Sequence, residues 1–298
     1  MKIKGISALL MAVVLALSDP ALSSCSGSRE YPVTVGSVTL DKEPEKVVAL
    51  DKNLADIISA EGYDVKLVGR SDEVNQKELE VVPSVGSANA PSVSAIVKKK
   101  ADLVLAGANT DPAVIKELSD KNIPVITFEA VNTRKQIKSL YRKTGALLGG
   151  SITGKKTGED SFLDLEKTLK DIKSAVSAGN VVRTICYFYF DNGVLKTFNG
   201  SCYGGKMLDY TGAVNVFKNQ TSDEADNKSL LLAKPDFIVC SDKSVYRYLK
   251  TNSELKKLGA LKGNTFIIPL EDITMQGNTS LTVLQKMLKK MYPEEFLT

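Results

Sequence analysis

The stretch from Thr153 to Ala178 constrains the fold of this chain more than any other segment. Its apolar residues recur at steps of three and four and so lie on one stripe of a helix: Phe162, Leu165, Leu169, Ile172 and Val176. It contains no proline, and a helix of this length spans roughly 35 Å. Because it falls in the middle of the chain, it predicts a rigid connection between two lobes.

Short apolar runs alternate with helical patterns on both sides of this stretch. Before it, we expect a hairpin or edge strand at 31–40, strands at 47–50, 66–69, 103–106 and 124–128, and helices at 54–60, 93–100, 112–120 and 136–148. After it, we expect strands at 181–190, 194–198, 237–240 and 265–268, and helices near 207–211, 245–249 and 280–291. This alternation predicts an α/β protein with two Rossmann-like lobes, mainly parallel sheets and one long connecting helix.

The N-terminus has the pattern of an export signal. Lys2 and Lys4 precede an apolar run, residues 6–17, that is too short for a permanent membrane anchor. The following residues, Leu-Ser-Ser-Cys at 22–25, resemble a bacterial lipobox, which predicts lipidation of Cys25 and a tether to the outer face of the cytoplasmic membrane. Plain secretion is the alternative. The predicted segments are a signal peptide at 1–25, a tether at 26–30, an N-terminal lobe at 31–152, a bridging helix at 153–179 and a C-terminal lobe at 180–298.

Composition excludes several classes of function. The chain has no His, which removes Ser-His-Asp and Cys-His triads and His-bound zinc or haem. A net charge of +4 is too small to indicate nucleic-acid binding. Cys186 and Cys240 lie in apolar runs that favour buried thiols, no CxxC spacing is present, and the state of Cys202 stays open. We therefore expect neither an enzyme nor a resident metal or cofactor.

In open α/β sheets, ligands bind outside the carboxyl ends of the strands. That rule selects a set of candidate ligand-binding residues: Asp51, Lys52, Asn53, Arg70, Ser87, Asn89 and Asn109 in the first lobe, and Tyr189, Asn199, Tyr203, Met275 and Gln276 in the second. Lys52 and Arg70 suit an anionic complex, whereas Tyr203 and Met275 supply apolar surface.

These candidates have structural alternatives. Asp51 and Asn53 are good helix N-caps, and Arg70 could form a surface ion pair with a neighbouring acid, Asp72 or Glu73. The candidates Asn89 and Asn109 are also ordinary turn formers. Tyr189 belongs to an aromatic strand, 187–190, whose side chains mostly fill a core.

Several stretches, in their order along the chain, resemble the solute-binding proteins of ABC importers for iron-siderophores, haem and cobalamin. They are EPEKVVAL at 43–50, PSVG at 83–86, ADLVL at 101–105, NIPV at 122–125, NGSCYGG at 199–205, GAVNVF at 212–217 and KPD at 234–236. The resemblance implies a monomer with two α/β lobes joined by a long helix, a ligand in the cleft between the lobes, and delivery to a permease with its ATPase. It also places Tyr203 in a cleft-lining loop.

The resemblance predicts a solute-binding lipoprotein that captures a metal chelate, with iron-siderophore as the first expectation and cobalamin or another corrinoid, or haem, as alternatives. Many family members carry a Glu in each lobe that docks on the permease, but the matching positions here are Ser94 and Lys228. Asp223 and Glu224 could substitute in the second lobe. A stand-alone binding or sensor module on the surface therefore remains the alternative from a different class.

Overall fold

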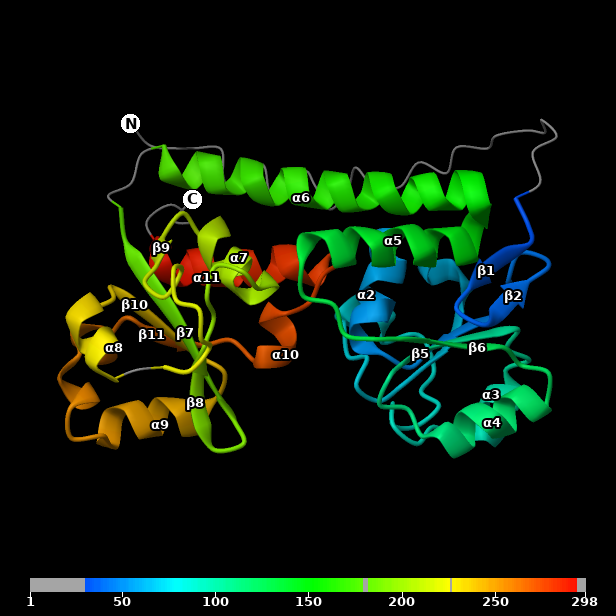
Figure 1. Cartoon of the computed structure of the whole chain (residues 1–298), viewed down its shortest axis with the longest axis horizontal. Helices are drawn as coiled ribbons and strands as arrows, with labels where there is room; N and C mark the ends of the chain where they lie inside the picture. Colours follow the sequence, from blue (N-terminus) through cyan, green and yellow to red (C-terminus); the bar gives the residue numbers. More distant parts are fainter. Residues whose placement is uncertain (1–29, 179–181, 226, 294–298) are drawn as a thin grey trace. The chain divides into compact units, whose positions relative to one another are not determined.

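A computed structural model describes residues 30–178, 182–225 and 227–293. The predicted signal peptide and Cys25 lie outside these residues. Contacts divide the described chain into two compact units, shown in Figure 1. The N-terminal unit comprises residues 30–165 and the short segment Gln276–Asn278, and the C-terminal unit comprises Glu166–Met275 and the residues from Thr279 onward. No helix of the described part is long and apolar enough to cross a membrane.

The N-terminal unit is built on a four-stranded sheet in the order β4-β3-β5-β6, with every pair parallel. Its strands are β3 (Val47–Ala49), β4 (Leu67–Arg70), β5 (Leu103–Gly107) and β6 (Val125–Phe128). Its helices are α2 (Lys52–Ala60), α3 (Val93–Lys98), α4 (Pro112–Asp120) and α5 (Arg134–Gly149). An antiparallel hairpin, β1 (Val33–Val35) and β2 (Val38–Leu40), precedes the sheet and turns at Gly36, which has a positive φ.

Parallel strands are buried on both faces by their crossover helices, so β3 and β5 are apolar throughout. Every residue of these two strands is buried. One side of the sheet packs with α3 and α4 in a core that includes Val48, Val104, Ile96 and Leu118.

The C-terminal unit contains a five-stranded mixed sheet in the order β11-β10-β7-β8, with β9 pairing β7. Its strands are β7 (Thr184–Asp191), β8 (Val194–Thr197), β9 (Val214–Asn215), β10 (Phe237–Cys240) and β11 (Thr265–Ile267). Its helices are α7 (Tyr203–Tyr210), α8 (Asn227–Ala233), α9 (Lys243–Thr251), α10 (Leu270–Ile273) and α11 (Thr279–Met291). Strand β8 is antiparallel to β7, and the other pairs are parallel.

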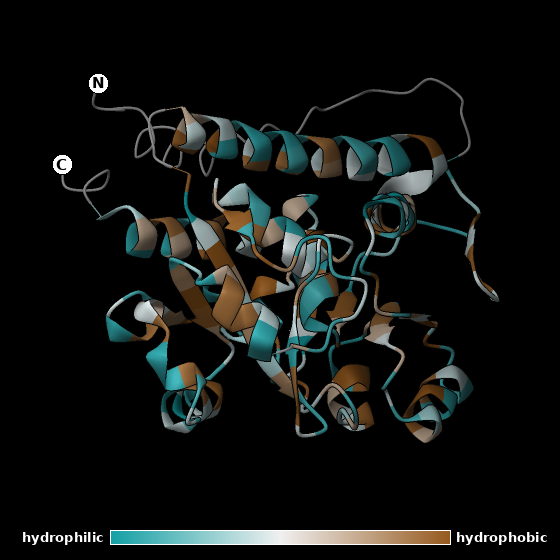
Figure 2. Cartoon of the chain, turned by 60° about the vertical axis from the view of Figure 1, so that its left-hand side comes forward, coloured by the Kyte–Doolittle hydropathy of each residue, from teal (hydrophilic) through white to brown (hydrophobic). Residues whose placement is uncertain are grey.

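The long helix is present as α6 (Lys155–Ser177), preceded by a π-helical turn, Gly150–Gly154. Its predicted stripe is buried, from Phe162 to Val176, and the boundary between the two units falls inside it, after Leu165. Figure 2 shows that its outward side is mostly hydrophilic, whereas hydrophobic residues concentrate on the central strands. In the N-terminal unit, a Cβ on Gly158 would lie 2.1 Å from the carbonyl oxygen of Tyr141, so α6 approaches the α5 backbone closely.

Cys186 and Cys240 are buried and free, which confirms the expectation of buried thiols. Burial raises the pKa of the Cys240 thiol to about 12 and raises that of Cys186 well above its usual value. The half-buried Cys202 is also a free thiol.

Candidate functional site

Two predicted side chains converge at the carboxyl edge of the N-terminal sheet. Asp51 follows β3, and Asn109 follows β5, its parallel neighbour. A Cβ on Gly107 would lie 2.9 Å from Asn109 Oδ1 and 3.1 Å from Asp51 Oδ2, so both polar groups lie over this glycine. Asp51 also caps α2, because its Oδ1 accepts a hydrogen bond from the Leu54 amide at 2.9 Å. The N-cap alternative is therefore confirmed for Asp51, and its second oxygen, Oδ2, lies over Gly107.

Asn53 and Gln276 form a reciprocal pair of hydrogen bonds within the N-terminal unit. Asn53 Nδ2 donates to Gln276 Oε1 at 3.0 Å, and the Gln276 amide donates to Asn53 Oδ1 at 2.9 Å. Gln276 Nε2 also donates to the carbonyl of Val131, and Tyr141 donates its hydroxyl proton to the Gln276 carbonyl. The segment Gln276–Asn278 is thereby fastened to this unit. Asn53 lies inside α2 and is not its cap.

The segment is also held by Asp56, a fully buried carboxylate of α2 that accepts a hydrogen bond from the Gly277 amide at 2.7 Å. Sequence reasoning missed Asp56, because an Asp among Leu54, Ile57 and Ile58 carries no sign of a partner more than two hundred residues away.

Arg70 organises the loop that follows β4. Its Nε donates to the Leu79 carbonyl at 3.1 Å, and its Nη1 donates to the Ser71 and Val74 carbonyls at 3.1 and 2.8 Å. The described residues contain no ion pair between Arg70 and Asp72 or Glu73. These acids instead accept hydrogen bonds from Ser84 Oγ and the Ala88 amide. The guanidinium therefore fixes the shape of this edge.

Two buried polar atoms of the same loop lack a hydrogen-bond partner in the described part of the chain, Ser71 Oγ and Gln76 Oε1. Gln76 Nε2 donates to the carbonyl of the half-buried Lys52 at 2.9 Å, which brings the loop against the start of α2. Buried polar atoms are nearly always satisfied, so these two atoms are candidates for ligand contact. The sequence rule missed Gln76 because it lies well beyond the end of β4.

Two further loops join along this edge. The carbonyl of Asn89 accepts from the Asp111 amide at 2.8 Å, and Thr110 donates its hydroxyl proton to the Ala88 carbonyl. The side chains of Asn89 and Asn109 are exposed. Ser87 accepts a hydrogen bond from the Ala90 amide and helps to close its own turn.

In the C-terminal unit, the predicted Tyr189 belongs to a cluster of three aromatic rings. Tyr187 and Phe198 are stacked with centroids 4.6 Å apart, and Tyr189 packs on Phe198 at 5.4 Å. Tyr187 is fully buried and donates to the Ile268 carbonyl, so most of the cluster belongs to the core, as expected. Tyr189 is half-buried, and burial raises the pKa of its hydroxyl.

The loop between β8 and α7 fixes Asn199 and Tyr203. Asn199 Oδ1 accepts from the amide and hydroxyl of Ser201, at 3.0 and 2.6 Å. Cys202 caps α7, and Tyr203 is its first residue. Helix α7 contains the predicted residues Met207–Tyr210 and begins at Tyr203, and a Cβ on Gly205 would lie only 1.8 Å from the Asn199 carbonyl oxygen. These glycines allow the loop to close tightly against the helix.

The remaining candidates at the C-terminal edge differ in exposure. Met275 is 2% exposed and lies in the core of its unit. Asp242, which sequence reasoning missed, follows β10 and caps α9. Hydrogen bonds from the side chains of Ser244 and Ser241 and from backbone amides lower the pKa of Asp242 to about 2.

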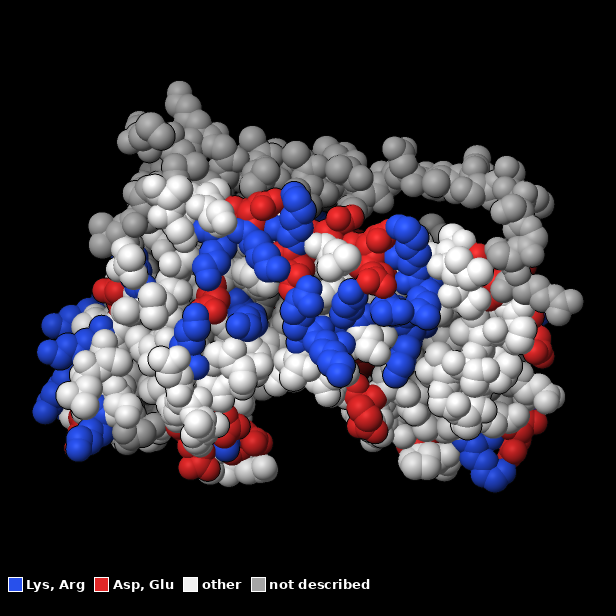
Figure 3. Space-filling model, turned by 45° about the horizontal axis from the view of Figure 1, so that its top comes forward, with Lys and Arg blue, Asp and Glu red and all other residues white. Residues whose placement is uncertain are grey.

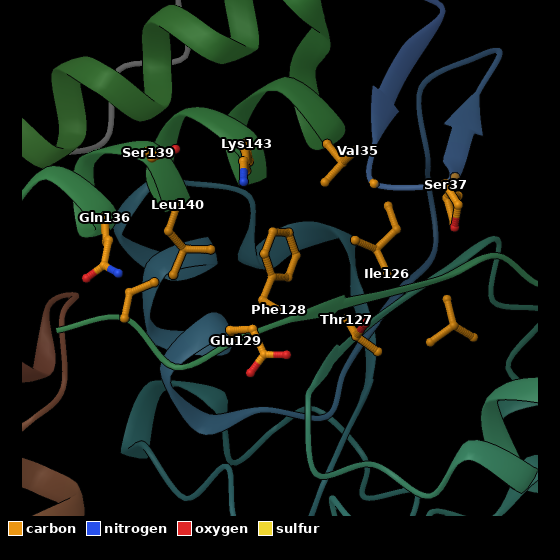
Figure 4. Close-up of a pocket in the computed structure, with 14 residues that line it drawn as sticks. Val35, Ser37, Ile126, Thr127, Phe128, Glu129, Gln136, Ser139, Leu140 and Lys143 are labelled. Atoms are coloured by element: carbon orange, nitrogen blue, oxygen red, sulfur yellow. The ribbon is translucent and has the colours of Figure 1, made fainter. Parts of the chain in front are cut away.

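A pocket of about 380 Å³ lies elsewhere in the N-terminal unit, between β2, β6 and α5 (Figure 4). Phe128 and Leu140 point into it, with Lys143 and Glu129 at its rim. None of the predicted ligand-binding residues lines it. Within the described ranges, no group of three or more Cys, Asp or Glu side chains is arranged to hold a metal ion.

Comparisons with known proteins agree with this fold. A family model described as periplasmic binding protein matches residues 47–268, which extends across both units. The uncharacterized ABC transporter substrate-binding lipoprotein YvrC of Bacillus subtilis (strain 168) is 25% identical, over 97% of this chain and 96% of its own. The Fe(3+)-citrate-binding protein YfmC of the same organism is 24% identical, over 91% of this chain and 88% of its own.

Among solved structures, a periplasmic heme-binding protein from Pseudomonas aeruginosa superposes with a TM-score of 0.63 at 20% identity, over 84% of this chain and 93% of its own. Relatives and solved structure together confirm the predicted α/β fold and the family to which the sequence motifs pointed. The chain belongs to the periplasmic binding protein family, and its relative YvrC is named as an ABC transporter substrate-binding lipoprotein.

Proposed function

We propose that this protein is the solute-binding lipoprotein of an ABC importer and that it captures a metal chelate, with a ferric chelate as the first candidate. The observation that carries the proposal is the family match over both units, whose relatives include an Fe(3+)-citrate-binding protein. The proposed role is binding and delivery, with no catalytic step.

The chemistry of the two edges supports a ligand that brings its own metal ligands. The chain has no His, and the described residues present no cluster of metal-binding side chains. The N-terminal edge offers amide, hydroxyl and carboxylate groups around Asp51 and Asn109, which suit the oxygen atoms of a chelator. The C-terminal edge offers the aromatic surface of Tyr189 and the first turn of α7. That the ligand lies between the two units stays a prediction.

A larger macrocycle, haem or a corrinoid, is the second candidate, and the aromatic cluster at Tyr189 favours it. A planar macrocycle stacks on aromatic rings, whereas a small citrate-like chelate depends on hydrogen bonds. The two ligand classes therefore place different demands on the two edges.

Lipid anchoring through Cys25 is part of the proposal, because YvrC is named as a lipoprotein and the motif at 22–25 resembles a lipobox. Partnership with a permease is also part of the proposal, although the expected docking acids are replaced. Ser94 of α3 and Lys228 of α8 are exposed where the family resemblance expects acids. Docking would then depend on other groups, or the protein acts as a stand-alone binding module.

A thermal-shift panel on the mature chain tests the ligand class. Ferric citrate, ferric siderophores, haem and cobalamin are compared with free iron and with metal-free chelators as controls. A ligand at one hundred times its Kd stabilises the folded state against unfolding by about 2.7 kcal/mol. A ferric chelate is therefore expected to raise the Tm, whereas its separate components are not. Absence of a shift with every metal complex would overturn the chelate proposal.

Co-purification tests the partner. When detergent extracts of the membranes are passed over the mature chain, it is expected to retain the permease–ATPase complex whose genes neighbour its own. Charge reversal of Asp223 and Glu224 is expected to weaken this retention, and reversal of the exposed Asp64 serves as the control. Ligand binding without any retained membrane complex would favour the stand-alone module.

A further inference from the structure

The first described residues are fixed against the turn between α5 and α6. Glu30 accepts hydrogen bonds from the Ile152 amide at 2.9 Å and from the Thr153 hydroxyl at 2.6 Å. The Ser151 amide donates to the Glu30 carbonyl, and Tyr31 donates its hydroxyl proton to the Leu147 carbonyl. The hydrogen bond from Thr153 lowers the pKa of Glu30, so its carboxylate stays ionised in this position. The point at which the tether meets the folded chain is therefore defined.

A second pocket, of about 370 Å³, lies beside this point in the same unit. It is formed by β1, α5, Ser151 and the first residue of α6. Three cations line it, Arg142, Lys143 and Lys155, and no carboxylate does. Figure 3 shows Lys and Arg side chains gathered over α5 on this face.

The three cations differ in how far they are already neutralised. Arg142 lies 3.5 Å from Glu159, which also pairs with Lys138. For Lys143 and Lys155, no ion pair is found among the described residues, and both side chains are exposed. Thr34, Ser139 and Ser151 complete the polar lining. The pocket is thus suited to a phosphate diester, which two lysines and an arginine would neutralise.

An apolar residue lies next to this pocket. Ile152, in the turn held by Glu30, is 55% exposed. A large apolar side chain beside lysines is the pattern of a surface that enters the interfacial region of a membrane.

The tether limits how far this surface can lie from the bilayer. The residues between Cys25 and Glu30 span at most about 18 Å when fully extended. With a lipid on Cys25, the α5–α6 turn and its pocket must therefore remain close to the lipid headgroups.

We propose that the pocket formed by Arg142, Lys143 and Lys155, together with Ile152, docks on the membrane by binding the phosphate headgroup of an anionic phospholipid. The inference rests on the proposed lipid anchor, which supplies proximity, and it goes beyond ligand capture. It gives the N-terminal unit a defined face toward the bilayer.

Hydrogen exchange of the lipidated mature chain tests the proposal. The chain is reconstituted in vesicles of neutral phosphatidylcholine, or of phosphatidylcholine with phosphatidylglycerol. The lipid anchor is the same in both kinds of vesicle, so any slowing caused only by closeness to the membrane is equal in the two measurements. The amides of Val33–Val35, Ser139–Ala146 and Ser151–Lys155 are expected to exchange roughly fivefold more slowly on anionic vesicles, the factor expected for attraction of about one lysine to an anionic leaflet.

Matched variants separate this pocket from general charge. The double variant Lys143→Gln, Lys155→Gln is expected to lose the slowing, because it removes two of the three charges of the pocket. Neither lysine forms an ion pair with another described residue, so the fold should be retained. The control Lys77→Gln, Lys98→Gln removes two exposed lysines of the same unit and is expected to retain it. Equal slowing in both variants, or slowing at other segments only, would overturn the proposal.

Two further arms distinguish the sources of the effect. Soluble glycerol phosphate added to neutral vesicles is expected to leave exchange unchanged, and equal slowing there would identify a general anion site instead. If the purified chain fails to float with neutral vesicles, the anchor is rejected. The headgroup pocket is then still tested by adding the unanchored chain to anionic vesicles, where absence of slowing rejects it too.

Discussion

The two units share an architecture but differ in the chemistry of their carboxyl edges. The N-terminal sheet is wholly parallel, and its edge carries Asp51 and Asn109 after their strands and Asn53 in the first turn of α2. The C-terminal sheet includes the antiparallel β8, and Phe198, directly after that strand, packs against Tyr187 and Tyr189. The reversed strand therefore leads to Phe198, on which the half-buried Tyr189 packs, a feature for which the N-terminal edge shows no counterpart among the described candidates. Similar folds in the two halves do not imply similar contacts with a ligand.

The largest expected effect tests whether the units are independent in stability. Gly158→Ala places a methyl group 2.1 Å from the Tyr141 carbonyl oxygen and forces α6 away from α5. We expect a loss of about 3 kcal/mol in the free energy of unfolding of the N-terminal unit, the upper range for overpacking. Denaturant titration measures this loss.

The described thiols all belong to the C-terminal unit and report on it separately. In Gly158→Ala we expect Cys186 and Cys240 to remain protected from thiol reagents at denaturant concentrations that unfold the N-terminal unit. Simultaneous exposure would show that the units unfold as one. Gly259→Ala, where a Cβ has nothing within 4 Å, is the control.

The second prediction concerns Gln276–Asn278, the segment that belongs to the N-terminal unit although it lies far along the chain. Asn53→Ala removes both hydrogen bonds to Gln276 and is expected to cost about 2 kcal/mol. Hydrogen exchange at Gln276–Asn278 should accelerate with it. Asn75→Ala, at an exposed position of the same unit, is expected to change neither quantity. Unaltered exchange at the segment would show that Asp56 and Tyr141 suffice to hold it.

The third prediction sharpens the contrast between the edges through ligand affinity. Asn109→Ala is expected to weaken binding of a ferric hydroxycarboxylate about tenfold, because a chelator oxygen loses its hydrogen bond. Tyr189→Ser is expected to weaken binding of a haem or corrinoid more than that of the small chelate. Calorimetric titration measures both constants, with Asn219→Ala as the control. Equal losses for both ligands in both variants would remove the proposed division of roles.

The smallest expected effect is a change in how steeply the free energy of unfolding depends on pH. Glu61 is buried against Thr144, and burial raises its pKa well above 4.5. The protonated form of Glu61 is favoured in the folded state. Its contribution to the free energy of unfolding is therefore complete below pH 4.5 and declines as the pH rises toward the folded-state pKa. Glu61→Gln is expected to flatten this decline in the N-terminal unit. Denaturant titrations at several pH values from 4 to 8 give the slope, and identical slopes would contradict the assignment.

Elements bounded by strong local signals could be predicted from the sequence. Helix α4 begins at Pro112 after the capping Asp111, and β10 lies between Asp236 and Ser241, so both have the predicted bounds. Asp51 and Asn109 could be placed at one edge, because adjacent parallel strands end together. The helix at Met207 was predicted, but its start at Tyr203 was not, because Gly204 and Gly205 favour a loop until their tight packing is known.

The environments of Arg70, Met275 and Gln276 could not be predicted in the same way. Arg70 is directed by three carbonyls of a loop without regular pattern. Gln276 is held by Asn53, Val131 and Tyr141, partners more than one hundred residues away. A rule based on strand ends gives a residue's position at the edge, but not whether its polar atoms are already bonded to the protein.

The buried thiols of the C-terminal sheet have a consequence for biogenesis. Because burial holds Cys186 and Cys240 in the neutral form, neither is a good nucleophile toward oxidants or disulfides. Once the unit is folded, these two thiols are protected from disulfide exchange, and the half-buried Cys202 is the more accessible thiol of the unit. Oxidising surroundings would therefore leave Cys186 and Cys240 of the folded chain as thiols.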